Sequence, residues 1–183
     1  MSRISKKPAS EPDLTDPDSA TVADPEVERQ RWWGRLLAWQ ARREHSRHEL
    51  LGKLQRAGAP LHLLDVDALL DRLAELGLQD DQRTASLHLR QQLARGRGQR
   101  AIRQKLQQTG LEQVLEPEAL AGLDWVAQAT DVLRRRFGDA PASDDRERAR
   151  RVRFLQYRGF SLSQALAALR RQGDLENDAT GAA

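Results

Sequence analysis

Two histidines and two glutamates lie close enough in the sequence to hold a metal ion. His45 and His48 are flanked by Glu44 and Glu49, and imidazole and carboxylate groups are common zinc ligands. Zinc proteases, however, place glutamate directly after the first histidine, where this chain has Ser46. The same letters fit a capping box, in which Ser46 and Glu49 satisfy amide groups at a helix start. We therefore expect a helix start here and no metal site.

A short glycine-rich stretch is the second candidate for chemistry. Residues 96–101 read Gly-Arg-Gly-Gln-Arg-Ala, the G-x-G-x-x-A form that binds a dinucleotide where a strand turns into a helix. The preceding residues 89–95 are helix formers, so no strand is available and the match is accidental. No P-loop, Ser/His/Asp set or carboxylate pair stands out either. The sequence predicts a protein that is not an enzyme and uses no cofactor.

Arginine gives the strongest chemical signal. The chain has 30 Lys/Arg and 27 Asp/Glu, a net charge of +3. Residues 1–30 hold seven acidic and four basic side chains, and residues 173–183 hold three acidic and no basic ones. Residues 31–172 therefore keep 26 basic and 17 acidic side chains. A basic body of this kind attracts phosphate groups or an acidic protein surface, and acidic ends can moderate that attraction.

Two segments concentrate the basic charge. Residues 82–111 contain no acidic side chain, whereas residues 131–158 interleave arginine with aspartate and glutamate. The alternative reading is a solvated helix face, because the arginine stem readily covers apolar neighbours. We favour a contact surface for the first segment and leave the two readings even for the second. The candidate contact residues are Arg90, Arg95, Arg97, Arg100, Arg103, Lys105, Arg134, Arg135, Arg136, Arg148, Arg150, Arg151, Arg153 and Arg158.

A repeated pattern shows what must position these side chains. The sequence Leu-Gln-x-x-Gly occurs three times, ending at Gly58, Gly110 and Gly159, so the repeats are about fifty residues apart. In each copy we expect the leucine to anchor a helix in the core and the glycine to end that helix in a left-handed turn. The glutamine is expected to be an exposed polar residue.

The helical periods around these repeats predict an all-α fold of three tandem three-helix units. Ser46, Asp65, Asp80, Asp124, Asp144 and Ser161 are suited to cap helices. The expected parts are a disordered segment 1–25, units 26–78, 79–123 and 124–172, and an acidic flexible tail 173–183, with the last helix stopping by Gly173. The units resemble helix-turn-helix modules. Stacked, they would form an elongated, curved array.

The amino-acid composition argues against several other classes of protein. The chain has no cysteine, which rules out disulfides and thiol catalysis. No apolar run approaches the roughly 20 residues needed to cross a bilayer, and the first residues lack the apolar core of a secretory signal. We therefore expect a cytoplasmic monomer that does not bind membranes.

Three stretches resemble the RecX family of recombination regulators. They are Arg-Arg-Glu-His-Ser at 42–46 leading to Glu49-Leu50, Leu-Ala-Glu-Leu-Gly-Leu at 73–78 with Asp80-Asp81 and Arg83, and Arg-Phe-Leu-Gln at 153–156 with Arg158-Gly159-Phe160-Ser161. The similarity spans residues 31–172. It implies an all-helical protein without catalytic residues that binds the RecA filament on DNA. Such binding would restrain the ATPase, strand-exchange and coprotease activities of RecA.

Two other functions remain open from the residues alone. A helical protein that binds DNA by itself would also need the arginines, and would bind naked duplex tightly with a steep dependence on salt. A structural adaptor would not need them. Substituting Arg95, Arg97, Arg100 and Arg103 by serine separates the adaptor from the other two.

Overall fold

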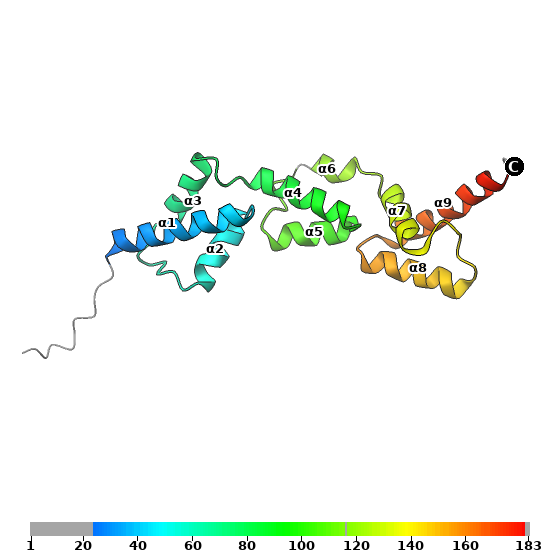
Figure 1. Ribbon diagram of the computed structural model, residues 1–183, viewed down its shortest axis with the longest axis horizontal. Helices are drawn as coiled ribbons and strands as arrows, with labels where there is room; N and C mark the ends of the chain where they lie inside the picture. The colour runs from blue at the N-terminus through cyan, green and yellow to red at the C-terminus, as the bar shows by residue number, and fades with distance from the viewer. Residues whose placement is uncertain (1–23, 116, 182–183) are drawn as a thin grey trace, which may run out of the picture.

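The computed structural model describes residues 24–115 and 117–181 of the 183-residue chain. Residues 1–23 of the segment predicted to be disordered lie outside this range. Within the described residues all regular structure is α-helical, in the nine helices α1 to α9. Figure 1 shows the helices following one another along a single elongated row, with the chain entering at one end and leaving at the other.

The first unit comprises α1 (Pro25–Arg42), α2 (Arg47–Arg56) and α3 (Val66–Glu75). Each helix is capped at its start by a side-chain oxygen that accepts a hydrogen bond from a backbone N–H group. These oxygens belong to Asp24, Ser46 and Asp65. The predicted capping box is present, since the Ser46 amide also donates to Glu49 at 3.2 Å. The most buried residues of α1 are Trp32 and Leu36.

The second unit comprises α4 (Asp81–Ala94), α5 (Gln99–Gln108) and the short α6 (Pro117–Ala121). The Asp80 carboxylate accepts from the amide of Arg83 at 3.0 Å and caps α4 as predicted. Gly98 precedes α5 without any side-chain cap. Instead of a side-chain cap, the start of α5 has backbone hydrogen bonds to the third unit.

The third unit comprises α7 (Trp125–Phe137), α8 (Asp145–Tyr157) and α9 (Leu162–Gly181). Asp124, Asp144 and Ser161 cap them as predicted. The predicted stop by Gly173 is wrong, because α9 continues to Gly181. Glycine inside a helix costs only about 1 kcal/mol relative to alanine, and Gly173 lacks the positive φ of the glycines that follow other helices, such as Gly58 and Gly159. Residues 173–181 of the predicted tail thus extend a helix, and residues 182–183 lie outside the described range.

The three copies of Leu-Gln-x-x-Gly take the same structure. Each leucine is at most 2% exposed and each glutamine is exposed. The three glycines end α2, α5 and α8 with φ between +69° and +93°, the left-handed region that favours glycine. The sequence-based interpretation of all three positions is confirmed. The glycines of the second and third copies also lie beside the preceding unit.

The buried apolar side chains form two separate clusters. One belongs to α1, α2, α3 and the loop before α3, and includes Trp32, Leu50 and Leu73. The other runs without a break through the second and third units and includes Ile102 and Leu155. Leu76 is 54% exposed, because α3 ends at Glu75 and Leu76 follows in the turn.

Equivalent contacts join successive units. At the first joint the Ser46 hydroxyl donates to the Thr109 carbonyl at 2.6 Å, and a Cβ on Gly110 would lie 2.6 Å from the Cβ of His48. At the second joint the amide of Gly98 donates to the Arg158 carbonyl at 2.9 Å. In both cases the residue before the middle helix of one unit meets the end of the middle helix of the next. The unit boundaries given above stay a prediction.

Candidate contact surface

The joint between the second and third units is built on close backbone approach. The amide of Arg100 donates to the Gly159 carbonyl at 3.0 Å, beside the bond from Gly98 to Arg158. A Cβ on Gly159 would lie 2.5 Å from the Cβ of Ala101, and one on Gly98 would lie 2.5 Å from the Gly159 carbonyl carbon. Contacts this short exclude any larger residue without movement of the backbone. The glycines therefore fix how α8 sits against the start of α5.

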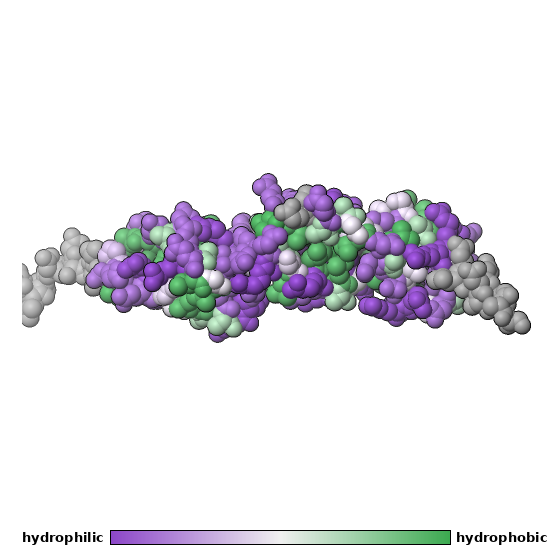
Figure 2. Space-filling view, turned by 90° about the horizontal axis from the view of Figure 1, so that it is seen from above, coloured by the Kyte–Doolittle hydropathy of each residue, from purple (hydrophilic) through white to green (hydrophobic). Residues whose placement is uncertain are grey.

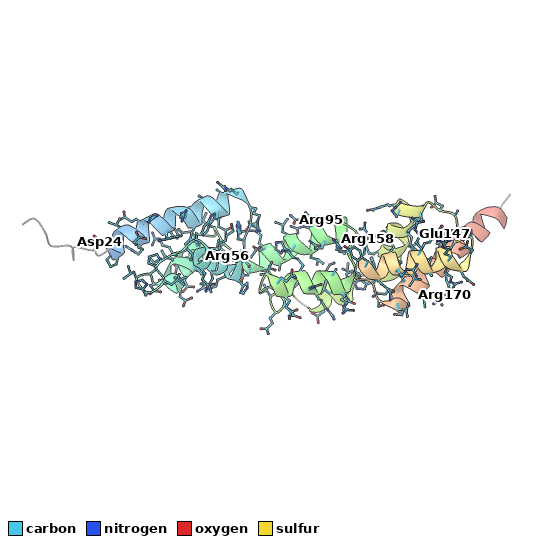
Figure 3. The ribbon with its side chains drawn as sticks, turned by 90° about the horizontal axis from the view of Figure 1, so that it is seen from below. Asp24, Arg56, Arg95, Glu147, Arg158 and Arg170 are labelled. Carbon is cyan, nitrogen blue, oxygen red and sulfur yellow. The ribbon has the colours of Figure 1, made fainter. Side chains whose placement is uncertain are left out.

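This joint opens into a pocket of about 240 Å³ that gathers four of the predicted contact residues. We call it the joint pocket. Figure 3 shows Arg95 and Arg158 next to each other where the second unit meets the third, with Glu147 farther along the third unit. The pocket is lined by Ala94, Arg95, Gly96, Val132, Arg135, Arg136, Phe154 and Arg158.

The charge of the joint pocket is uncompensated. No acidic residue lines it, and none of its four arginines forms an ion pair with a carboxylate that the structure describes. Most of the arginine–carboxylate pairs instead lie in the first unit or at its joint with the second, such as Arg47 with Asp67 and Arg83 with Glu44. The basic charge therefore stays available mainly on the second and third units.

Two arginine side chains of the joint pocket pack against phenylalanine rings. Phe154 and Phe137 pack edge to face with ring centroids 5.3 Å apart. The Arg158 guanidinium lies 4.9 Å from the Phe154 ring centroid and donates to the Arg95 carbonyl at 2.7 Å. Arg136 lies 5.5 Å from the Phe137 centroid. Stacking on aromatic faces holds guanidinium groups in place while their outer N–H groups stay able to donate.

Arg151 is not available for contact, although it was predicted as a contact residue. It is 2% exposed, and its guanidinium donates to Glu147 at 2.7 Å, to Gln172 at 3.0 Å and to the Ala140 carbonyl at 2.8 Å. The Ser143 amide, together with Arg151, lowers the pKa of Glu147 to about 2. Arg151 thus ties α8 to α9 and to the loop after α7, which is a structural role.

The remaining predicted residues do not gather at one place. Arg134 pairs with Asp139 at 2.7 Å. Arg148, Arg150 and Arg153 are exposed on α8, the last two in an open hollow that also contains Asp144 and Glu147. On the second unit Arg90 and Arg103 are exposed, Arg97 is half-buried, and Arg100 lines a different hollow beside Gly159. Lys105 is half-buried on α5, and its charge helps to lower the pKa of the buried His88.

The histidines hold no metal site. Among the described residues no group of three or more potential ligands could hold a metal ion. His45 is 2% exposed with its Nδ1 2.8 Å from the Arg43 carbonyl, and burial is the main cause that lowers its pKa.

None of the helices in 24–115 and 117–181 is both long and apolar enough to span a bilayer.

Comparison with known proteins decides the family. A model of the third three-helix domain of RecX matches residues 124–169. The regulatory protein RecX of Acidithiobacillus ferrooxidans is 46% identical over 127 residues, which is 69% of this chain and 79% of the relative. That of Halorhodospira halophila is 44% identical over 136 residues, 73% of this chain and 81% of the relative. The chain belongs to the RecX family.

Solved RecX structures share the fold. The crystal structure of RecX from Lactobacillus salivarius superposes with a TM-score of 0.65 at 16% identity, covering 81% of this chain and 98% of the other. A second RecX crystal structure gives a TM-score of 0.58 at 22% identity, over 76% and 70% of the two chains. The resemblance inferred from the sequence motifs is confirmed, and with it an all-helical regulatory protein that is not an enzyme.

The sequence missed the walls of the joint pocket. Val132 and Phe154 are not among the predicted contact residues, yet both line the pocket. The Cγ2 atom of Val132 would lie 2.7 Å from a Cβ on Gly96. One available signal was the spacing of Gly96, Gly98 and Gly159, since glycines at successive helix ends mark places where backbones approach closely.

Proposed function

We propose that this RecX-family protein regulates homologous recombination and the SOS response by binding the RecA filament on DNA. Binding restrains the ATPase, strand-exchange and coprotease activities of RecA. The protein acts as a cytoplasmic monomer, and its units 26–78, 79–123 and 124–172 dock as one row along the filament. Family membership supports the regulatory role, and the elongated row supports contact with an extended partner.

The observation that carries the proposal is the uncompensated charge of the joint pocket. A RecA filament on DNA offers both phosphate groups and acidic side chains, and either would pair with free guanidinium groups. The lining of the pocket is mixed, since Val132 and Phe154 lie beside the four arginines. On the face shown in Figure 2, apolar side chains gather over the middle of the molecule among hydrophilic ones. Apolar and basic surface side by side suits a protein partner that carries DNA.

The test is the rate of ATP hydrolysis by RecA on single-stranded DNA, titrated with the purified protein. The expected result is inhibition at stoichiometric amounts or below. Arg135→Ser/Arg136→Ser should weaken inhibition at least tenfold, whereas Arg42→Ser/Arg56→Ser, which removes equal charge from exposed arginines of the first unit, should change it less than twofold. An unchanged rate, together with no co-sedimentation with filaments, would exclude RecA as the partner.

A further inference from the structure

The joint pocket collects more positive charge than its helix ends require. Arg95, Arg136 and Arg158 lie at or beside the C-terminal ends of α4, α7 and α8. Basic side chains at such ends are stabilised by the helix dipole, which is worth roughly half a negative charge per end. Three ends therefore account for about one and a half charges, against four guanidinium groups. The remaining positive charge is free to pair with an anion from outside the chain.

The four arginines are not equivalent. Arg158 is held by its bond to the Arg95 carbonyl and by the face of Phe154, so it contributes to the wall of the pocket. The side chains of Arg95, Arg135 and Arg136 are exposed, and none of the three donates to another described side chain or carbonyl through its guanidinium. These three come from two different units. All three line the joint pocket together with Val132 and Phe154, whose side chains we call its apolar floor.

We infer that the joint pocket binds the phosphate group of a nucleotide, with the sugar or base lying against the apolar floor. Guanidinium groups match phosphate oxygens geometrically and pair with them in bidentate fashion. A carboxylate side chain would satisfy the arginines as well, but it would leave the apolar floor uncovered, whereas a nucleotide supplies an anion and a flat apolar group together. The inference rests on the proposed function and names the group that the joint contacts.

A consequence concerns the joint itself. The pocket exists only while the second and third units are docked through Gly98 and Gly159. A ligand that binds only this docked arrangement stabilises it by mass action. Nucleotide binding should therefore slow amide hydrogen exchange at Gly98 and Arg100, which donate across the joint.

The experiment measures binding to the full chain without RecA. Fluorescence anisotropy reports a labelled twelve-residue oligothymidylate, and NMR shifts of arginine Nε–H groups report thymidine monophosphate and inorganic phosphate. We expect oligothymidylate affinity to fall at least tenfold in Arg135→Ser/Arg136→Ser and to stay within twofold in Arg42→Ser/Arg56→Ser. Arg135→Lys/Arg136→Lys keeps the charge but loses the guanidinium groups, and should fall in between. It also serves if the serine variant fails to fold.

The outcomes separate the sources of phosphate. Shifts at the joint arginines with oligothymidylate alone assign a DNA strand, and equal shifts with the monophosphate assign a free nucleotide; both support the inference. Oligothymidylate affinity that is equal in the serine and control variants overturns it, as does binding of poly-glutamate without binding of any phosphate. Because RecA is absent, such a failure would leave the proposed restraint of RecA to be judged by its own titration.

Discussion

Three glycines differ in what a Cβ atom would cost at their positions, which is backbone strain, steric overlap, or both. Gly58 has φ +73° with open space where a Cβ would lie, Gly98 has ordinary φ but a Cβ would meet backbone at 2.5 Å, and Gly159 has φ +93° with a Cβ contact at 2.5 Å. Left-handed φ costs a non-glycine residue about 1 kcal/mol, and a buried overlap typically costs about 1–3 kcal/mol. A side chain would therefore cause backbone strain at Gly58, steric overlap at Gly98, and both at Gly159.

Alanine substitution should rank these glycines. We expect Gly58→Ala to lower the free energy of unfolding by about 1 kcal/mol, Gly98→Ala by about 1–3 kcal/mol, and Gly159→Ala by about 2–4 kcal/mol. Urea unfolding followed by circular dichroism gives the three values. If Gly58→Ala and Gly159→Ala cost the same, the contact of Gly159 with Ala101 does not hold the joint.

Burial and exposure of a side chain could be predicted from the sequence where they follow from the local helical pattern. They could not be predicted where they depend on residues distant in the sequence. The buried leucines and exposed glutamines of the three repeats follow from helical spacing within a few residues. Arg150 and Arg151 are adjacent and alike in the sequence, yet one is exposed and the other is buried against Gln172, 21 residues away. Periodicity cannot assign that difference, because it depends on where α9 packs.

At the scale of elements, helix starts were predictable and one helix end was not. Side-chain caps are local, so Ser46, Asp80 and Ser161 could be assigned from the sequence. Gly173 has the residue type of a stop, but α9 passes through it. The joint pocket was also beyond prediction as a set, since its walls come from α4, α7 and α8 and the turns after them. Only the packing of three helices makes those arginines neighbours.

The course of α9 gives a testable difference between two glycines. A Cβ would meet nothing within 4 Å at either Gly173 or Gly138, but only Gly138 has positive φ, at +82°. We expect Gly173→Ala to stabilise the protein by about 0.5–1 kcal/mol, because alanine lowers the conformational entropy of the unfolded chain and is favourable within a helix. Gly138→Ala should destabilise it by about 1 kcal/mol. Thermal unfolding measures both, and a destabilising Gly173→Ala would contradict a continuous α9.

The first joint contains a histidine that should make stability depend on pH. His88 on α4 is 7% exposed and its Nδ1 has no hydrogen-bond partner among the described residues. Burial is the main cause that lowers its pKa; Lys105 and Arg43 lower it further, and Glu49 opposes them. The fold therefore favours neutral His88. Its contribution is complete above the ordinary pKa near 6.5 and is lost as the pH falls towards the lowered value.

The expected result is a free energy of unfolding that falls as the pH is lowered from about 7.5 to about 5. His88→Gln should flatten this dependence, and His45, whose pKa burial also lowers, should account for part of what remains. His62→Gln, at an exposed position, is the matched control and should keep the full slope. Urea titrations at several pH values measure it, and an unchanged slope in His88→Gln would remove His88 as the cause.

The whole molecule is a row of three units, but its core is divided in two. The first unit has a cluster of its own and meets the second unit through polar groups, including Ser46 with Thr109 and Arg83 with Glu44. The second and third units share one continuous apolar cluster. Apolar burial is the main source of cooperativity between elements, whereas exposed ion pairs contribute at most about 1 kcal/mol. The protein should therefore unfold in two blocks, α1 to α3 and α4 to α9.

Hydrogen exchange on two core variants tests this division. Leu50→Ala and Leu106→Ala each remove a fully buried leucine side chain, a change that typically costs about 2–5 kcal/mol. Leu50→Ala should reduce protection of amides in α1 to α3 and leave α4 to α9 nearly unchanged. Leu106→Ala should reduce protection throughout α4 to α9, including the third unit, since both units share its cluster. Loss of protection along the entire chain in Leu50→Ala would mean that the first joint couples the units as strongly as the second.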